Sequence, residues 1–328
     1  MAGFDTGKVT LARELGLLGL VATSVCTVIG GGINVLSVQV QAQVPGVGSL
    51  VPLAFLVGAL PAVFGALVYA ILASAMPRAG GGYIYTSRGL HPFVGFMATF
   101  SKWFGLSAIV GAIAFADIPL LADAVHHAAW IGAREFFLAI EGFLRSPAGS
   151  IGIPMAMIWV FWLINLLGVR RYENTVTLLM FLMLAGGVVL IITGFLHDHR
   201  DYAAVLMQRE GVDIQEVMER AVMGTNKTLA VLRAAAVLFF AYLGFASISQ
   251  AGGEAKDPQR NLPRAFLIST AVIVAYYLLF SWAVYHAIPA PYIQVRAVEL
   301  QQAGGTVTAA GLMGFLLPGW LAVFVVLM

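Results

Sequence analysis

Charged side chains are scarce in this chain. Only 10% of its 328 residues are Asp, Glu, Lys or Arg, whereas an average soluble domain carries about 25%. None of these four residue types occurs between Leu15 and Pro77, although about 20 apolar residues are enough to cross a bilayer. The stretch must therefore hold two spans. This composition excludes a soluble protein and predicts an all-α, polytopic protein embedded in the lipid bilayer.

Cysteine and basic clusters are also nearly absent. The single Cys26 excludes an intrachain disulfide and most cysteine-rich metal sites. The net charge is only +2, and no basic cluster indicates a nucleic-acid partner. The apolar segments contain neither a nucleophile–base pair nor a set of metal ligands. We therefore expect a protein that is not an enzyme and has no metal or other resident cofactor.

Glycine, by contrast, is present where a helix should exclude it. Gly30, Gly31 and Gly32 lie at the midpoint of the first apolar stretch. Three adjacent glycines cost a helix about 3 kcal/mol relative to alanine. One use for them is a deliberate break whose free backbone groups face a ligand, which is tolerated at membrane depth only beside protein or a water-filled cavity. The other is close helix packing by small residues, and the local sequence leaves both open.

Apolar segments recur along the whole chain. Between them lie polar connections, and the connection at 125–150 is partly amphipathic. An eighth segment begins near Gly311 but stops at Met328 before it completes a span, so we expect a chain truncated within its eighth helix. The seven complete segments are 15–43, 50–75, 93–124, 151–169, 172–196, 229–253 and 265–288.

The orientation follows from Lys and Arg in the short connections, which gather on the cytoplasmic side of membrane proteins. With the N-terminus in the cytoplasm, Lys8, Arg78, Arg88, Arg170 and Arg171 all lie inside. We therefore expect a multi-pass protein of the plasma membrane with a cytoplasmic N-terminus. Lys102 and Asp117 are about 22 Å apart on one helix at 1.5 Å per residue, which predicts that they lie near opposite interfaces and snorkel toward water.

Three stretches together resemble a known family, the amino acid–polyamine–organocation transporters, and in particular its amino acid permeases. The first is Ile29-Gly30-Gly31-Gly32-Ile33. The second is the segment 69–85, which ends in Pro77-Arg78-Ala79-Gly80-Gly81-Gly82-Tyr83-Ile84-Tyr85. The third is Phe239-Phe240-Ala241-Tyr242-Leu243-Gly244-Phe245-Ala246-Ser247, followed by the charged segment 253–265. The order and spacing of all three agree with the family over the whole chain.

The resemblance implies two inverted five-helix repeats whose first helices are broken. The single transporter domain, 1–328, would then hold the first repeat at 13–196 and part of the second at 229–328. The substrate would lie between the two breaks. The free N–H groups from Gly31 onward would receive a carboxylate, and the carbonyls of Ile29 and of residues 240–243 an ammonium group. The predicted substrate-binding residues are Ile29, Gly30, Gly31, Gly32, Ile33, Asn34, Phe240, Ala241, Tyr242, Leu243, Gly244 and Ser247.

Some positions depart from the family pattern. Asn34 replaces the usual apolar residue and either contacts substrate or bonds a neighbouring helix. Met180 replaces the helix-5 lysine of many proton-linked relatives, which leaves the coupling ion, H⁺ or Na⁺, open. A cytoplasmic gate is expected to use Arg78, Arg88, Glu254 and Lys256.

The function that the resemblance implies is secondary active transport. A symporter or exchanger would move amino acids, its small-molecule substrates, across the plasma membrane by alternating access. A polyamine or other organic cation carrier and a non-transporting amino acid sensor on the same fold are the alternatives. The sequence does not fix the oligomeric state.

Overall fold

A computed structural model describes residues 13–129, 131–222, 224, 226–303 and 305–327 of the chain. These residues form helices and one isolated β-bridge, between Leu15 and Ala255. Lys8, which contributes to the predicted orientation, and Met328 lie outside the described residues. The all-α prediction is confirmed.

Seven segments of the described chain are long and apolar enough to cross a membrane. This confirms a polytopic membrane protein, and the relation between the two repeats stays a prediction. The spans comprise α1 (Leu17–Val28) with α2 (Gly31–Gln43), η1 (Gly48–Leu50) with α3 (Val51–Ala75), α5 (Pro92–Ala116) with α6 (Ile118–Ala128), α8 (Pro147–Leu166), α9 (Val169–Leu196), α12 (Lys227–Leu238) with η2 (Phe239–Tyr242) and η3 (Phe245–Gly253), and α13 (Pro258–Ala287).

Shorter helices fill the connections. The connections expected at 197–226 and 289–310 contain helices, because short polar helices lack the long apolar stripe that identifies a span. The eighth helix is divided between Gly314 and Gly319, and Pro318, which has no N–H, directly precedes its second part. The short elements are α4 (Gly81–Gly89), α7 (Arg134–Arg145), α10 (His199–Glu210), α11 (Ile214–Met218), α14 (Ala290–Gln302), α15 (Ala309–Gly314) and α16 (Gly319–Leu327).

The predicted helix 93–124 is divided at Asp117. Helix α5 ends at Ala116 and α6 begins at Ile118, so the carboxylate-bearing residue stands at the junction. Pro119 follows directly and has no N–H to continue the α5 hydrogen-bond ladder. The division places Asp117 more than two helical turns before the end of this span at Ala128.

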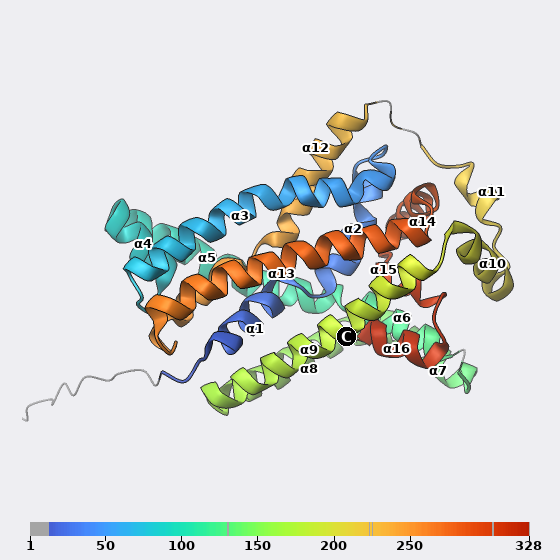
Figure 1. The fold of residues 1–328 in the computed structure, drawn as a ribbon. Coiled ribbons are helices and arrows are strands. Elements are labelled where there is room, and N and C mark those ends of the chain that lie inside the picture. The colour runs from blue at the N-terminus through green and yellow to red at the C-terminus, as the bar shows by residue number, and fades with distance from the viewer. Residues whose placement is uncertain (1–12, 130, 223, 225, 304, 328) are drawn as a thin grey trace, which may run out of the picture.

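Helix α13 runs through the middle of the bundle (Figure 1) and packs along α3, α1 and α9. One end of the bundle, here called the N-terminal side, holds the start of α1, α4 and the start of α13. The opposite end, here called the far side, holds α7, α10, α11 and α14. Large apolar side chains on α5 and α8 point away from the protein, as expected for surfaces in contact with lipid. They include Phe96, Phe100, Trp103, Phe104, Trp159 and Phe161.

Both expected helix breaks are present, and they lie against each other. In the first, α1 ends at Val28, Ile29 and Gly30 are extended, and α2 begins at Gly31. In the second, Leu243 is extended and Gly244 has φ of 120°, a left-handed conformation that glycine adopts without strain. A methyl group on Gly244 would lie 2.9 Å from the carbonyl oxygen of Thr27. Only glycine therefore permits this approach of the two backbones.

Tyr277 on α13 joins the two breaks. Its fully buried hydroxyl lies 2.8 Å from the carbonyl oxygen of Val28 and 3.0 Å from that of Ala241. It therefore offers its one proton to the carbonyl at the end of each interrupted helix. A buried carbonyl without a donor is costly, so this hydroxyl supports the irregular backbone at both places.

We predict that Tyr277→Phe loosens both breaks together. Loss of the donor leaves buried carbonyls unsatisfied, which costs about 1–3 kcal/mol, and amide hydrogen exchange should accelerate in residues 25–34 and in residues 238–247. Tyr285→Phe is the control, because its hydroxyl donates to the carbonyl oxygen of Ser37 at 2.8 Å and accepts from Gln41 at 3.0 Å, both on α2. Its effect should stay within residues 37–41. Unchanged exchange at either break in Tyr277→Phe would contradict this role.

Candidate functional site

A cavity of about 180 Å³ opens beside the first helix break. Residues of the break form one wall, and α6, α8, α9, α13 and α16 supply the rest. It is lined by Ile29, Gly30, Gly31, Ile33, Asn34, Asp117, Leu120, Leu121, Met157, Met183, Gly187, Leu190, Tyr276, Val325 and Val326. We call it the central cavity.

The break turns the start of α2 toward the central cavity. The first N–H groups of a helix have no partner inside it, and α2 begins at Gly31, which lines the cavity. The aligned peptide dipoles add a partial positive charge at this end. Backbone alone therefore offers donors and a favourable potential to a negatively charged group.

Asn34 adds a side-chain group to the same wall. It lines the central cavity one turn along α2, and its buried amide oxygen, Oδ1, has no hydrogen-bond partner within the described residues. Buried polar atoms are rarely left unpaired. Of the two roles foreseen for Asn34, a bond to a neighbouring helix through this oxygen is not formed, and the oxygen is free to accept from a ligand.

Asp117 faces the same helix end from the α5–α6 junction. A methyl group on Gly31 would overlap Oδ1 of Asp117 and would lie 3.0 Å from Leu120. Among the described residues that line the central cavity, Asp117 alone is charged, and no hydrogen bond or ion pair of its carboxylate is found in the part of the chain that the structure covers. The sequence placed Asp117 near a membrane interface, whereas the structure places it in the lining of the central cavity beside the first break.

The second break, at Leu243 and Gly244, does not line the central cavity. Tyr242 donates to the carbonyl oxygen of Phe55 on α3 at 3.1 Å, while the side chains of Phe240 and Leu243 are exposed. Ser247 lies in the first turn of η3. The structure thus brings Asp117 together with the predicted substrate-binding residues of the first break and the start of α2, except Gly32. Substrate contact by residues 240–244 and Ser247 stays a prediction.

Tyr276 on α13 is a further lining residue that the sequence did not single out. A methyl group on Gly187 of α9 would overlap its hydroxyl, so Gly187 makes room for the ring against α9. The pair Gly186-Gly187 in the middle of a span is the sequence signal that marks this close approach.

The N-terminal side of the bundle is closed by backbone contacts. The N–H of Leu15 donates to the carbonyl oxygen of Glu254 at 3.0 Å, and the N–H of Lys256 donates to that of Leu15 at 2.8 Å. The N–H of Gly16 donates to the carboxylate of Glu173 on α9 at 3.1 Å. The start of α1 is therefore tied to the segment after η3 and to α9.

Three of the four predicted gate residues, Glu254, Lys256 and Arg78, lie in or beside the segments that make these contacts. Glu254 and Lys256 contribute their main chains to it, and a methyl group on Gly252 would lie 2.8 Å from the carbonyl oxygen of Arg78. Arg88 lies in the last turn of α4. No ion pair joins these four side chains in the described chain, so their pairing stays a prediction.

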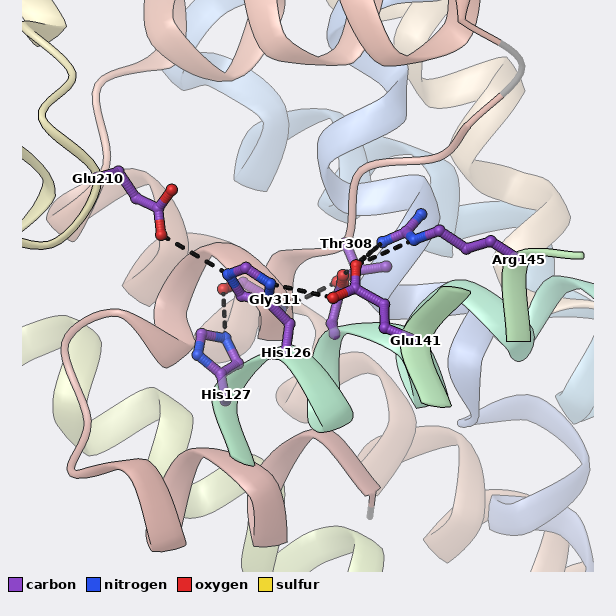
Figure 2. A network of polar contacts seen from close by, with 8 residues as sticks. His126, His127, Glu141, Arg145, Glu210, Thr308 and Gly311 are labelled. Atoms are coloured by element: carbon purple, nitrogen blue, oxygen red, sulfur yellow. Dashed lines mark hydrogen bonds and ion pairs between the residues drawn. The ribbon is translucent and has the colours of Figure 1, made fainter. Parts of the chain in front are cut away.

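A second, polar cavity of about 230 Å³ lies on the far side. Figure 2 shows its network, in which His126 of α6 stands between Glu141 of α7, at 3.3 Å, and Glu210 of α10, at 3.6 Å. Arg145 pairs with Glu141 at 3.1 Å, and Thr308 donates to Asp123 at 2.5 Å. These contacts tie α6 to α7, α10 and the start of α15.

Comparisons with known proteins agree on one family. Residues 15–328 match the family described as amino acid permease. The branched-chain amino acid permease BcaP of Bacillus subtilis is 28% identical over 319 residues, which cover 91% of this chain and 61% of that protein. The vacuolar cationic amino acid transporter 4 of Arabidopsis thaliana is 26% identical over 292 residues, 87% of this chain and 45% of that protein.

An uncharacterized transporter of Mycobacterium tuberculosis is similar to the same extent. It is 27% identical over 293 residues, which cover 89% of this chain and 57% of that protein. The chain therefore spans between 45% and 61% of the length of these three relatives.

We predict that position 34 is reached by water. In a Cys26→Ala background, Asn34→Cys should react with a small, charged methanethiosulfonate about tenfold or more faster than Ser37→Cys, because Ser37 is fully buried three residues further along α2. Mass spectrometry of the labelled protein measures both rates. Equal rates would contradict an aqueous cavity beside the first break.

Proposed function

The chain belongs to the amino acid permease family, and from that premise we propose that the protein is a secondary active transporter that moves amino acids across the plasma membrane by alternating access. The observation that carries the proposal is the start of α2, which opens onto the central cavity with its first N–H groups unpaired within the helix.

The chemistry of this opening fits the part that all amino acids share. A helix N-terminus favours a carboxylate, through its free N–H groups and its dipole. On the other side of the break, the last carbonyl of α1, that of Val28, already accepts from Tyr277. The carbonyl of Ile29 is therefore the acceptor that we propose for an ammonium group. Ile29 lies between these two helix ends and lines the cavity. A zwitterion is thus recognised at both ends by backbone, with Asn34 as an added acceptor.

The relatives support amino acids as the substrate class. One is named for branched-chain and another for cationic amino acids, so the shared chemistry is that of the α-amino and α-carboxylate groups. Backbone recognition accounts for such a range, because it contacts only those groups.

Alternating access requires a closure on each side of the site. On the N-terminal side the candidate is the contact of Leu15 and Gly16 with Glu254, Lys256 and Glu173, with Arg78 and Arg88 nearby. On the far side it is the network around His126. Arg78 lies between α3 and α4, Arg88 lies in the last turn of α4, and Arg170 and Arg171 lie in the first turn of α9. Arginines in and beside these short connections support a cytoplasmic N-terminus.

Asp117 favours a second candidate, a carrier of polyamines or other organic cations. Its ionised carboxylate would attract an ammonium group into the cavity without any need for a carboxylate on the substrate. In the first candidate a substrate carboxylate binds at the start of α2, whereas in the second the substrate has no carboxylate to place there. A measurement of amino acid binding therefore distinguishes the two.

We predict that Gly31→Ala weakens amino acid binding by about tenfold or more, equivalent to about 1.4 kcal/mol, because the added methyl overlaps Asp117 at the start of α2. Binding of radiolabelled amino acids to the purified protein measures the effect.

Gly32→Ala is the matched control, because a methyl group there meets nothing within 4 Å and alanine is a better helix former. It should bind as the wild type does. The proposal fails if the wild type binds none of the common amino acids, and the placement of the site fails if both variants bind equally well.

A further inference from the structure

Asp117 lies beside the start of α2, the helix end to which an amino acid carboxylate would be attracted. We propose that Asp117 is the coupling residue of this transporter, and that it carries one proton whenever an amino acid is bound in the central cavity. The protein is then a proton symporter. This inference rests on the proposed function and adds to it the coupling ion and the residue that carries it.

The carboxylate of Asp117 lies at the first residue of α2. Gly31 is the first residue of α2, and the space where its side chain would begin is filled by Oδ1 of Asp117. The α-carboxylate of a substrate is attracted to the same helix end. Two carboxylates that share one site do not both ionise, because their charges repel at short distance. One of the pair must hold a proton while the substrate is bound.

The described lining of the central cavity contains no cationic side chain that could neutralise Asp117. The other described lining residues are uncharged, and Tyr276 of α13 is the titratable one among them. Met180 of α9 is buried and does not line the cavity. No lysine or arginine from α2, α8, α9, α13 or α16 is among the residues that line it, so a proton is the means of neutralising Asp117 when the ligand is a zwitterion.

The charged groups nearest along α6 belong to the far-side network instead. Asp123 lies six residues further along the chain and accepts from Thr308 of α15. Glu141 and Arg145 of α7 and Glu210 of α10 surround His126 there (Figure 2). These groups interact with one another, and none of them lines the central cavity.

The charge balance then specifies the transport step. A zwitterion bound beside protonated Asp117 leaves the loaded cavity neutral, whereas beside ionised Asp117 it leaves one negative charge at membrane depth, where charge is costly. Asp117 takes a proton from the side where the amino acid enters and releases it on the side where the amino acid leaves. One proton and one positive charge cross with each zwitterion.

The sign of the pH dependence follows. Because the bound state holds more protons than the free state, amino acid affinity should be highest at acidic pH and should fall as the pH rises. An amine without a carboxylate behaves in the opposite way, since it binds ionised Asp117.

The experiment uses the intact protein in proteoliposomes as wild type, Asp117→Asn and Asp213→Asn. Asp213 caps α11 on the far side by accepting from the N–H of Gln215, and asparagine caps helices equally well. Each protein is assayed for amino acid affinity at mildly acidic and mildly alkaline pH, for exchange of labelled against unlabelled amino acid, and for accumulation driven by a pH gradient.

In the wild type and in Asp213→Asn, affinity should fall about tenfold or more from acidic to alkaline pH, and an acidic outside should drive accumulation. Asp117→Asn should bind with equal affinity at both pH values and catalyse exchange, but should not accumulate amino acid. The transport current of the wild-type protein gives a test that does not depend on any variant. It should correspond to one positive charge moved with each zwitterion.

The outcomes separate this inference from the proposed function. Accumulation by Asp117→Asn, pH-independent wild-type affinity or electroneutral transport of a zwitterion would overturn the role of Asp117, while exchange of amino acids would leave the proposed function standing. If the wild type binds a diamine and no amino acid, both are overturned, and the central cavity is an organic cation site.

Discussion

The buried hydroxyl of Tyr277 holds the two helix breaks together. A helix that stops inside a membrane leaves carbonyl groups where no water can reach them, and here two helices stop side by side. Tyr277 lies 2.8 Å from the carbonyl oxygen of Val28 and 3.0 Å from that of Ala241. One side chain of an unbroken helix thus stabilises both ends, while Gly244 lets the two backbones approach.

The stabilised break has a consequence for charge. Once α1 ends at Val28, the start of α2 presents positive potential inside the protein, and in the empty cavity Asp117 is the group beside it. The same potential that would hold a substrate carboxylate therefore favours an ionised Asp117 in its absence. Proton coupling through Asp117, as proposed above, needs no lysine in α9. It is consistent with Met180 at the position where the family resemblance leads one to expect a lysine.

Much of the fold was readable from sequence because a membrane leaves few choices. The charge-free run to Pro77 predicted two spans, and Gly30–Gly32 with Gly244 predicted the breaks, since glycine at mid-depth is costly without a use. The site was only partly readable. The sequence placed Asp117 at an interface because the position was judged only from its distance to Lys102 along one straight helix. The structure divides that helix at Asp117, two residues before Pro119. Residues 240–244 were grouped with the site, and their contact with substrate stays a prediction, because none of them lines the central cavity.

The central claim is that the start of α2 and Asp117 together hold the carboxylate end of an amino acid. A structure of the intact protein with a bound amino acid at acidic pH, determined by electron cryomicroscopy, tests it most directly. We expect the substrate carboxylate to lie against the N–H of Gly31, within hydrogen-bond distance of Asp117. An amino acid bound elsewhere, such as in the far-side cavity around His126, or bound with its ammonium group at Gly31, would contradict it.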